Sequence, residues 1–143
     1  MRNRISGAWF VILLLLAGSC DRNDQGGDPG LVQLVRARIG TEYLDLNRVV
    51  PDIAVDKNAV IEFSNVLDTA SARKSILLKK GGITAVSASV SFMDDNRTVV
   101  LQPSGNLDHF AEYTLEITTS LRGANRETFP GVSYIFKTVN GKM

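Results

Sequence analysis

The sequence has a single cysteine, a single histidine and a single tryptophan, and each scarcity excludes a class of function. One cysteine, Cys20, excludes a disulfide within the chain, so a folded domain must be held together by apolar burial. One histidine, His109, excludes a histidine-rich metal cluster. The tryptophan, Trp9, lies in an N-terminal apolar segment, which leaves the rest of the chain without the residue that most often stacks on sugar rings.

The sequence also lacks an excess of charge of either sign. It has 16 Lys and Arg against 15 Asp and Glu, a net charge of +1 at pH 7. Nucleic-acid binding needs a concentrated basic surface to neutralise phosphates. We therefore expect no nucleic acid among the partners.

The N-terminal residues have the pattern of a secretory signal. Arg2 and Arg4 precede an apolar run from Ala8 to Ala17, and small residues follow before Cys20. That run has about half of the roughly twenty residues that a bilayer-spanning helix needs. A transmembrane or buried helix is the less favoured alternative.

The stretch Leu16-Ala17-Gly18-Ser19-Cys20 resembles the lipobox of bacterial lipoproteins, in which the cysteine is acylated and the chain is cut in front of it. The resemblance implies a lipoprotein signal peptide over residues 1–19 and a membrane-lipid partner bound through acylated Cys20. Each buried acyl CH₂ contributes about 0.8 kcal/mol, and two or more chains give a lasting anchor. An incidental thiol at Cys20 is the alternative.

After Cys20, residues 21–30 have no aliphatic side chain and are rich in Gly, Asp and Asn. Such a segment is too polar to bury, so residues 20–30 are expected to form a flexible tether with a reach of about 35 Å. Asp21 and Asp24 also resemble the surface-export signal of Bacteroidetes-type lipoproteins. We expect a lipid-anchored protein of the bacterial cell envelope, in the outer membrane, facing either the surface or the periplasm.

From Leu31 onward, apolar and polar residues alternate in short stretches, which indicates half-buried β-strands. The alternation places five aromatic side chains on core-facing positions: Phe63, Phe92, Tyr113, Tyr134 and Phe136. The stretches are Val35–Ile39, Ala59–Phe63, Val86–Phe92, Thr98–Gln102, Tyr113–Ile117 and Val132–Lys137.

Turn-forming residues separate these stretches, and one short segment, Asp68–Lys74, favours a helical turn or two. The turns are expected at Gly81-Gly82, Asp94–Asn96, Pro103–Asn106 and Arg122–Asn125. About seven short antiparallel strands with frequent turns predict an all-β, two-sheet sandwich that forms one domain over residues 31–143. Asp94–Asn96 is favoured as a hairpin turn over half of a calcium site, since no further acidic residues lie nearby in the sequence.

The order of these signals resembles the SbsA-type bacterial Ig-like domain, a module of S-layer and envelope proteins. The resemblance implies an Ig-like β-sandwich, and lectin-like or glycan-degrading domains commonly follow such a module in longer lipoproteins. The loop Leu121–Asn125 departs from the family pattern because it lacks an aspartate, so no cation binding is transferred to it. The stretches that carry the resemblance are Ala59–Asp68, Thr98–Pro103, Leu107 with Tyr113–Ile117, and Tyr134–Thr138.

No group of residues predicts catalysis, a cofactor or a metal site. Asp94 and Asp95 are adjacent on a turn, whereas acid–base catalysis needs carboxylates that converge on a pocket. The serines of Val86–Phe92 form the polar face of a strand and lie in no nucleophile elbow. A grouping of Asp108 and His109 with a serine is conceivable, but a solvated loop is favoured.

Two non-catalytic functions remain. The first is an envelope module that acts as a spacer, an adhesion domain or a protein-interaction domain. The second is a glycan-binding accessory domain, alone or as the N-terminal module of a longer glycan-binding or glycan-degrading lipoprotein. The loop aromatics Tyr43, Phe110 and Phe129 are the possible ligand contacts, and partly buried lids are the alternative for them.

Overall fold

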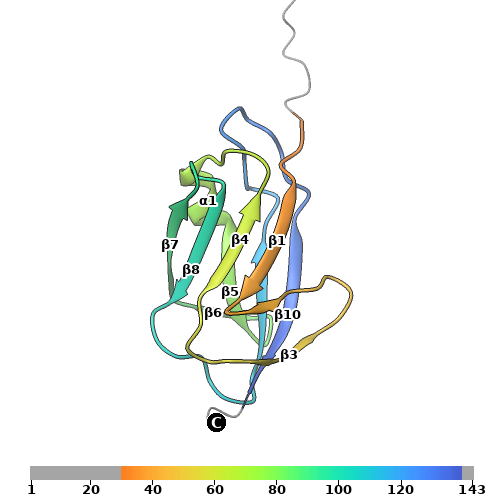
Figure 1. Ribbon diagram of the computed structural model, residues 1–143, viewed down its shortest axis with the longest axis vertical. Coiled ribbons are helices and arrows are strands. Elements are labelled where there is room, and N and C mark those ends of the chain that lie inside the picture. Colours follow the sequence, from red (N-terminus) through yellow and green to blue (C-terminus); the bar gives the residue numbers. More distant parts are fainter. Residues whose placement is uncertain (1–29, 140–143) are drawn as a thin grey trace, which may run out of the picture.

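The computed structural model describes residues 30–139, which form a β-sandwich with one short helix (Figure 1). The predicted signal peptide, Cys20 and all but the last residue of the predicted tether lie outside the described residues. The strands are β1 (Leu34–Ile39), β2 (Glu42–Tyr43), β3 (Val50–Ile53), β4 (Ala59–Phe63), β5 (Ile76–Lys80), β6 (Thr84–Val86), β7 (Ala88–Met93), β8 (Thr98–Pro103), β9 (Glu112–Ile117) and β10 (Val132–Thr138), and the helix is α1 (Thr69–Ser75).

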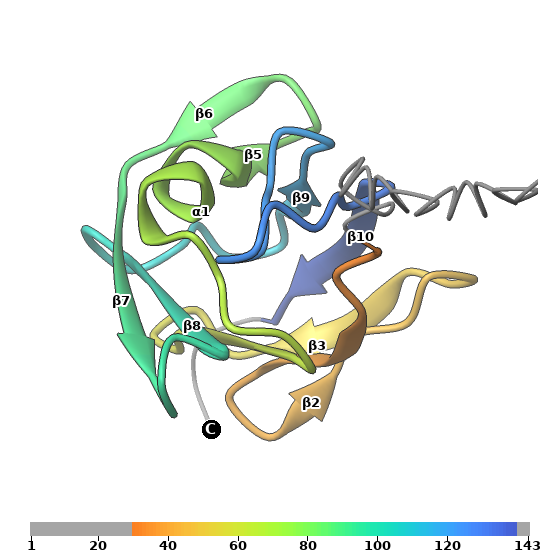
Figure 2. The same ribbon diagram turned by 90° about the horizontal axis from the view of Figure 1, so that it is seen from above.

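The strands form two five-stranded sheets that pack face to face, with orders β2-β1-β4-β8-β7 and β3-β10-β9-β5-β6. Every pair is antiparallel except β3 with β10, which run parallel. Figure 2 shows the two layers from above, with α1 close to β5. The sequence predicted the two-sheet sandwich correctly. The structure adds β2, β3 and β5 to the expected six stretches and divides one of those stretches, Val86–Phe92, between β6 and β7.

The core lies between the inward faces of the two sheets. Four of the five aromatics predicted to face the core are buried there, and Phe92 on β7 is half-buried against the same cluster. The ring of Tyr113 stacks on Phe136 at 5.6 Å between centroids. Alternation predicted these positions because every second side chain of a strand faces the same side of its sheet.

The stretch Val86–Phe92, expected to be one strand, changes sheets at Ser87. Val86 ends β6, which pairs with β5, whereas Ala88 begins β7, which pairs with β8 in the other sheet. The alternation continues without a break because both halves face the same core. The single-strand prediction was therefore wrong in extent, although its inward face was correct.

In β1 the predicted inward position of Val35 is also wrong, since its side chain is 61% exposed. The ladder between β1 and β4 shifts register between Leu34 and Arg36. Such a β-bulge adds one residue to a strand and reverses the side on which the following residues face. Leu34 therefore packs against the core in place of Val35.

The short helix and the turns were predicted at the right places. Asp68 is the N-cap of α1, and its carboxylate accepts a hydrogen bond from the Ala70 backbone N–H at 3.2 Å. This satisfies one of the amide groups that a helix start leaves without an intrahelical partner. Asp94, Asp95 and Asn96 all adopt left-handed φ angles in the turn between β7 and β8.

Candidate functional site

Of the three aromatic residues considered as ligand contacts, Tyr43 lies on β2 at the edge of its sheet and is 55% exposed. It pairs with Arg38, and on the neighbouring strands Arg36 forms an ion pair with Glu62 at 2.7 Å. The hydrogen bond to Glu62 is the largest cause that raises the pKa of Arg36, and Tyr43 adds a smaller contribution. Tyr43 therefore lies at an exposed sheet edge beside an arginine that is already paired.

Phe110 is 74% exposed in the loop between β8 and β9, and it adopts a left-handed backbone conformation with φ 53°. Its loop is held at both sides. The Thr138 hydroxyl donates to the Asp108 carbonyl at 2.6 Å and accepts from the Ala111 N–H at 3.0 Å. The Tyr113 hydroxyl accepts from the Asp108 N–H at 2.8 Å. These bonds fix the backbone that presents the Phe110 ring to solvent.

Phe129, the third candidate, is 4% exposed and belongs to the core. Its ring meets Phe63 edge to face, with 6.0 Å between centroids. An aromatic ring in this position has no free face for a ligand. The exposed residues that remain are Tyr43, on the edge strand β2 of one sheet, and Phe110, in the loop between β8 and β9 that crosses from that sheet to the other.

The structure does not bring Asp108 and His109 into a catalytic arrangement. The Asp108 carboxylate pairs with the Lys80 ammonium at 2.5 Å, and this contact is the main cause that lowers the pKa of Asp108 and raises that of Lys80. The Nδ1 atom of His109 lies 3.1 Å from the Val139 carbonyl oxygen. In a catalytic triad the carboxylate would orient the histidine ring, whereas here it is bound to a lysine.

Acidic side chains do not gather into a metal site within residues 30–139, where no group of three or more His, Cys, Asp or Glu is close enough to hold an ion. In the turn at Asp94–Asn96, Oδ2 of Asp94 accepts from the Thr98 hydroxyl at 2.7 Å. That bond closes the hairpin. The same described part of the chain has no helix long and apolar enough to cross a membrane.

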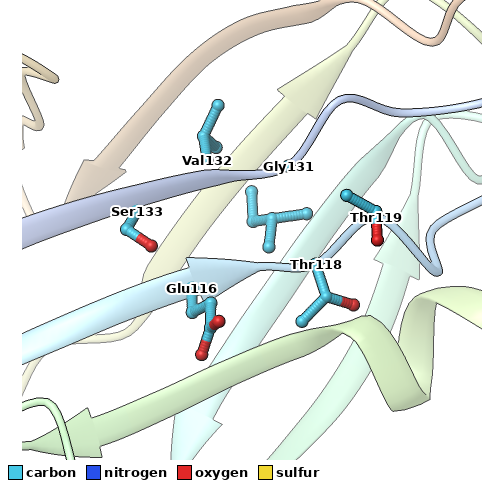
Figure 3. Close-up of a pocket in the computed structure, with 7 residues that line it drawn as sticks. Glu116, Thr118, Thr119, Gly131, Val132 and Ser133 are labelled. Carbon is cyan, nitrogen blue, oxygen red and sulfur yellow. The ribbon is translucent and has the colours of Figure 1, made fainter.

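An open hollow of about 420 Å³ lies where β9 ends and β10 begins (Figure 3). Its polar groups come from Glu116, Thr118, Thr119 and Ser133, and Gly131 and Val132 complete its wall. Glu116 is also the ion-pair partner of Lys79. Because Glu116 is the one ionisable side chain in the lining, the hollow lacks the pair of carboxylates that acid–base chemistry uses.

A nearly buried carboxylate, Glu127, lies in the loop between β9 and β10, and no sequence pattern pointed to it. Its Oε2 accepts from the Asn125 N–H at 2.9 Å, and its Oε1 lies 3.4 Å from the amide nitrogens of Asn65 and Asn125. A hydrogen bond from its own backbone N–H is the largest cause that lowers the pKa of Glu127. Only folding brings Asn65 to this loop, so no sequence spacing could have shown the contact.

The described residues thus offer exposed aromatic side chains and polar surface, with no catalytic group assembled among them. The sequence profile of the family described as "Bacterial Ig-like domain" matches residues 48–138, which is more than half of the chain. None of the curated proteins matches the sequence.

Solved structures share the fold at low sequence identity. The chain aligns with domains 1–6 of the surface layer protein SbsC (TM-score 0.53, 14% identity), covering 76% of this chain and 14% of that one. It also aligns with the native conformation of E. coli alpha-2-macroglobulin (TM-score 0.55, 14% identity), covering 77% of this chain and 6% of that one. The part of the Escherichia coli protein that spans domains MG0-NIE-MG1 gives a TM-score of 0.55 at 14% identity, over 77% and 32% of the two chains. This chain therefore corresponds to a small part of each of these proteins.

Proposed function

Because the chain belongs to the bacterial Ig-like domain family, we propose that it is a non-catalytic module of the bacterial cell envelope, anchored to lipid through Cys20. Residues 20–30 act as the tether, and the domain serves as a spacer, an adhesion domain or a protein-interaction domain. Outer-membrane placement and surface exposure belong to the same proposal, on the strength of Asp21 and Asp24.

The observation that carries the spacer function is the direction of the chain through the sandwich. β1 begins at one end of the long axis, and β10 finishes at the opposite end (Figure 1). Because the proposed tether, residues 20–30, leads into the end at which β1 begins, the end at which β10 finishes would lie farthest from the anchor. Such a geometry increases the distance between a membrane and whatever the far end contacts.

The charges and contacts of the site agree with a passive module. Two ion pairs lie near the exposed aromatics, Arg36 with Glu62 and Lys80 with Asp108. A general acid or base needs a pKa near the operating pH and access to a substrate. Lowering the pKa of Asp108 by pairing moves that carboxyl away from such a role.

Glycan binding is the second candidate, favoured by the exposed rings of Tyr43 and Phe110. Both rings could stack on a sugar, but they lie on separate elements, β2 and the loop between β8 and β9. Tyr43 lies opposite Arg38 on β1, whereas the Phe110 loop is bound to Tyr113 and Thr138. Glycan binding therefore ranks below the spacer function.

Lipid anchoring is tested with the full precursor, a Cys20→Ala variant and a Ser19→Ala control that keeps a small residue before the cysteine. We expect wild type and the control in the membrane fraction, with acyl mass on the N-terminal peptide, and Cys20→Ala without it. Equal partitioning of all three, with no acyl mass on the wild-type peptide, would refute the anchor.

A further inference from the structure

Among the four edge strands of the described sandwich, β7 is the longest and most regular. It has six residues, against two in β2, three in β6 and four in β3. β3 is further interrupted by Pro51 and by Asp52, whose φ is 61°. An edge strand of this length is a template on which another strand can pair.

The backbone of β7 directs alternate residues away from the sheet. The Ser104 N–H donates to the Ser87 carbonyl at 2.9 Å, and antiparallel hydrogen-bonded pairs recur at every second residue. Ser89 and Ser91 therefore bond to β8, while the N–H and C=O groups of Ala88, Val90 and Phe92 point outward. Pro103, which lacks an N–H, lies opposite Ala88, where the ladder needs no donor.

Among residues 30–139, Arg73 of α1 contacts the outward edge of β7. Its Nη1 donates to the Val90 carbonyl at 2.5 Å, and its guanidinium lies 5.0 Å from the centre of the Phe92 ring. The Arg73 side chain is exposed, so a strand can displace it. The strand itself, Ala88–Met93, has no charged residue, although native edges are commonly protected by lysine or proline.

A hollow of about 140 Å³ lies between β7 and the opposite sheet, and its lining is mainly apolar but also includes Arg73 and Lys79. Ala88 and Val90 form one wall, and Ile76, Leu78 and Val86 are in the other. The small side chain of Ala88 leaves this hollow open beside the outward edge. A strand added there would direct one apolar side chain toward it.

We propose that β7 pairs antiparallel with β7 of a second copy of this chain, in a two-fold register centred on Val90. In this register each Val90 faces its equivalent, and each Ala88 faces Phe92 of the other copy. The large Phe92 ring then lies beside the small Ala88 and its hollow. The outward N–H and C=O groups of all three residues are satisfied. The paired strands themselves carry no charge, whereas the Arg73 side chains of the two copies approach each other at the centre of the register.

The strand is self-complementary in side-chain size, because Phe92 of each copy lies opposite Ala88 of the other, and it carries no charge that would repel its equivalent. A second copy is therefore the occupant. One added strand buries less than the roughly 1,600 Å² of a standard stable interface. The dimer is therefore weak. Disulfide cross-linking detects such a dimer better than size-exclusion chromatography does. The pairing does not depend on the proposed lipid anchor.

The register is tested with two cysteine variants of the full chain, Ser89→Cys and Ser91→Cys, both in a Cys20→Ser background that removes the native thiol. In the proposed dimer Ser89 faces Ser91 of the other copy in a non-hydrogen-bonded pair, with Cα atoms about 4.5 Å apart, which suits a disulfide. Equivalent positions are about 7–8 Å apart on the diagonal. Oxidation of the mixture should give a disulfide-linked heterodimer of the two variants, and each variant alone should give little cross-linked dimer.

Two further changes probe the edge. Val90→Pro removes the outward N–H on an edge strand, where proline is tolerated, and should abolish the heterodimer while the melting temperature shows a folded chain. Arg73→Ala removes the competing donor and should raise the heterodimer yield by about threefold to tenfold, the factor for one net hydrogen bond. Equal cross-linking of the mixture and the single variants, or no heterodimer from folded chains, would overturn the proposal.

Discussion

Gly123 and Glu127 share one small space in the loop between β9 and β10: a β-carbon placed on Gly123 would lie 2.1 Å from Oε2 of Glu127. The two residues are also joined by a backbone hydrogen bond from the Gly123 N–H to the Glu127 carbonyl at 3.0 Å. The glycine is required here because the carboxylate occupies the volume of any side chain. Its φ is not left-handed, so the reason is space and not backbone freedom.

We predict that Gly123→Ala destabilises the fold by about 1–3 kcal/mol, the usual cost of overpacking. Gly105→Ala is the matched control, because a β-carbon there meets nothing within 4 Å. Chemical denaturation of both variants measures the difference. Equal stability of the two would show that the Glu127 side chain moves aside without cost.

The carboxylate of Glu127 is expected to make stability depend on pH. Its folded pKa is lowered from the ordinary 4.5, so the folded state favours the ionised form more than the unfolded state does. This contribution is fully present above pH 4.5 and is lost as the pH falls through the folded pKa. Urea midpoints of wild type and Glu127→Gln should therefore differ most near neutral pH and converge on acidification. A difference that stays constant over that range would contradict the assignment.

Phe63 and Phe110 make a matched pair of aromatic residues with opposite burial. Phe63→Ala empties a core position against Phe129 and should cost about 3–5 kcal/mol. With no disulfide in the domain to compensate, the melting temperature should fall by more than about 10 °C. Phe110→Ala removes an exposed ring and should leave the melting temperature almost unchanged. Similar shifts for both variants would show that the burial assignment is wrong.

Thr138 is expected to hold the Phe110 loop through its hydroxyl. Thr138→Val keeps the shape of the side chain but removes the bonds to the Asp108 carbonyl and the Ala111 N–H. Leaving these part-buried backbone groups without their partner should cost about 1 kcal/mol, the net value of a typical hydrogen bond. Hydrogen exchange of the Ala111 amide should accelerate more than that of the amides in β4. Uniform acceleration would indicate global destabilisation only.

For the isolated chain we predict no affinity for soluble oligosaccharides tighter than about 1 mM, which corresponds to about −4 kcal/mol. Tyr43 and Phe110 lie on different elements, β2 and the loop between β8 and β9, and Phe129 is buried. A glycan array followed by calorimetry measures this. A micromolar sugar whose binding is lost in Tyr43→Ala or Phe110→Ala would favour the glycan-binding function over the spacer.

The sequence determined the sandwich and most of its core. β4, β9 and β10 alternate strictly, and alternation is a local property that survives whatever the strand pairs with. α1 was predictable because Asp68 caps it through its own neighbours. Of the three aromatics expected on loops, only Phe110 is an exposed loop residue, since Tyr43 lies on β2 and Phe129 is buried.

The alternation of side chains did not predict which strands pair with one another. β5 was not expected because Ile76, Leu77 and Leu78 are a continuous apolar run, in which Leu77 lies half-buried on the outer face. The change of sheet at Ser87 leaves no mark in the pattern, since both β6 and β7 face one core. The bulge beside Val35 is likewise decided by the register with β4.

What only the tertiary structure decided are the contacts between segments distant in the sequence. Phe129 is buried because folding brings it against Phe63, and Glu127 is nearly buried because Asn65 reaches it across the top of the sandwich. Side-chain alternation and caps are set by neighbours within a few residues, so they can be predicted from sequence. Burial of a loop residue is set by which other loops close over it, and that depends on the folded arrangement of both sheets.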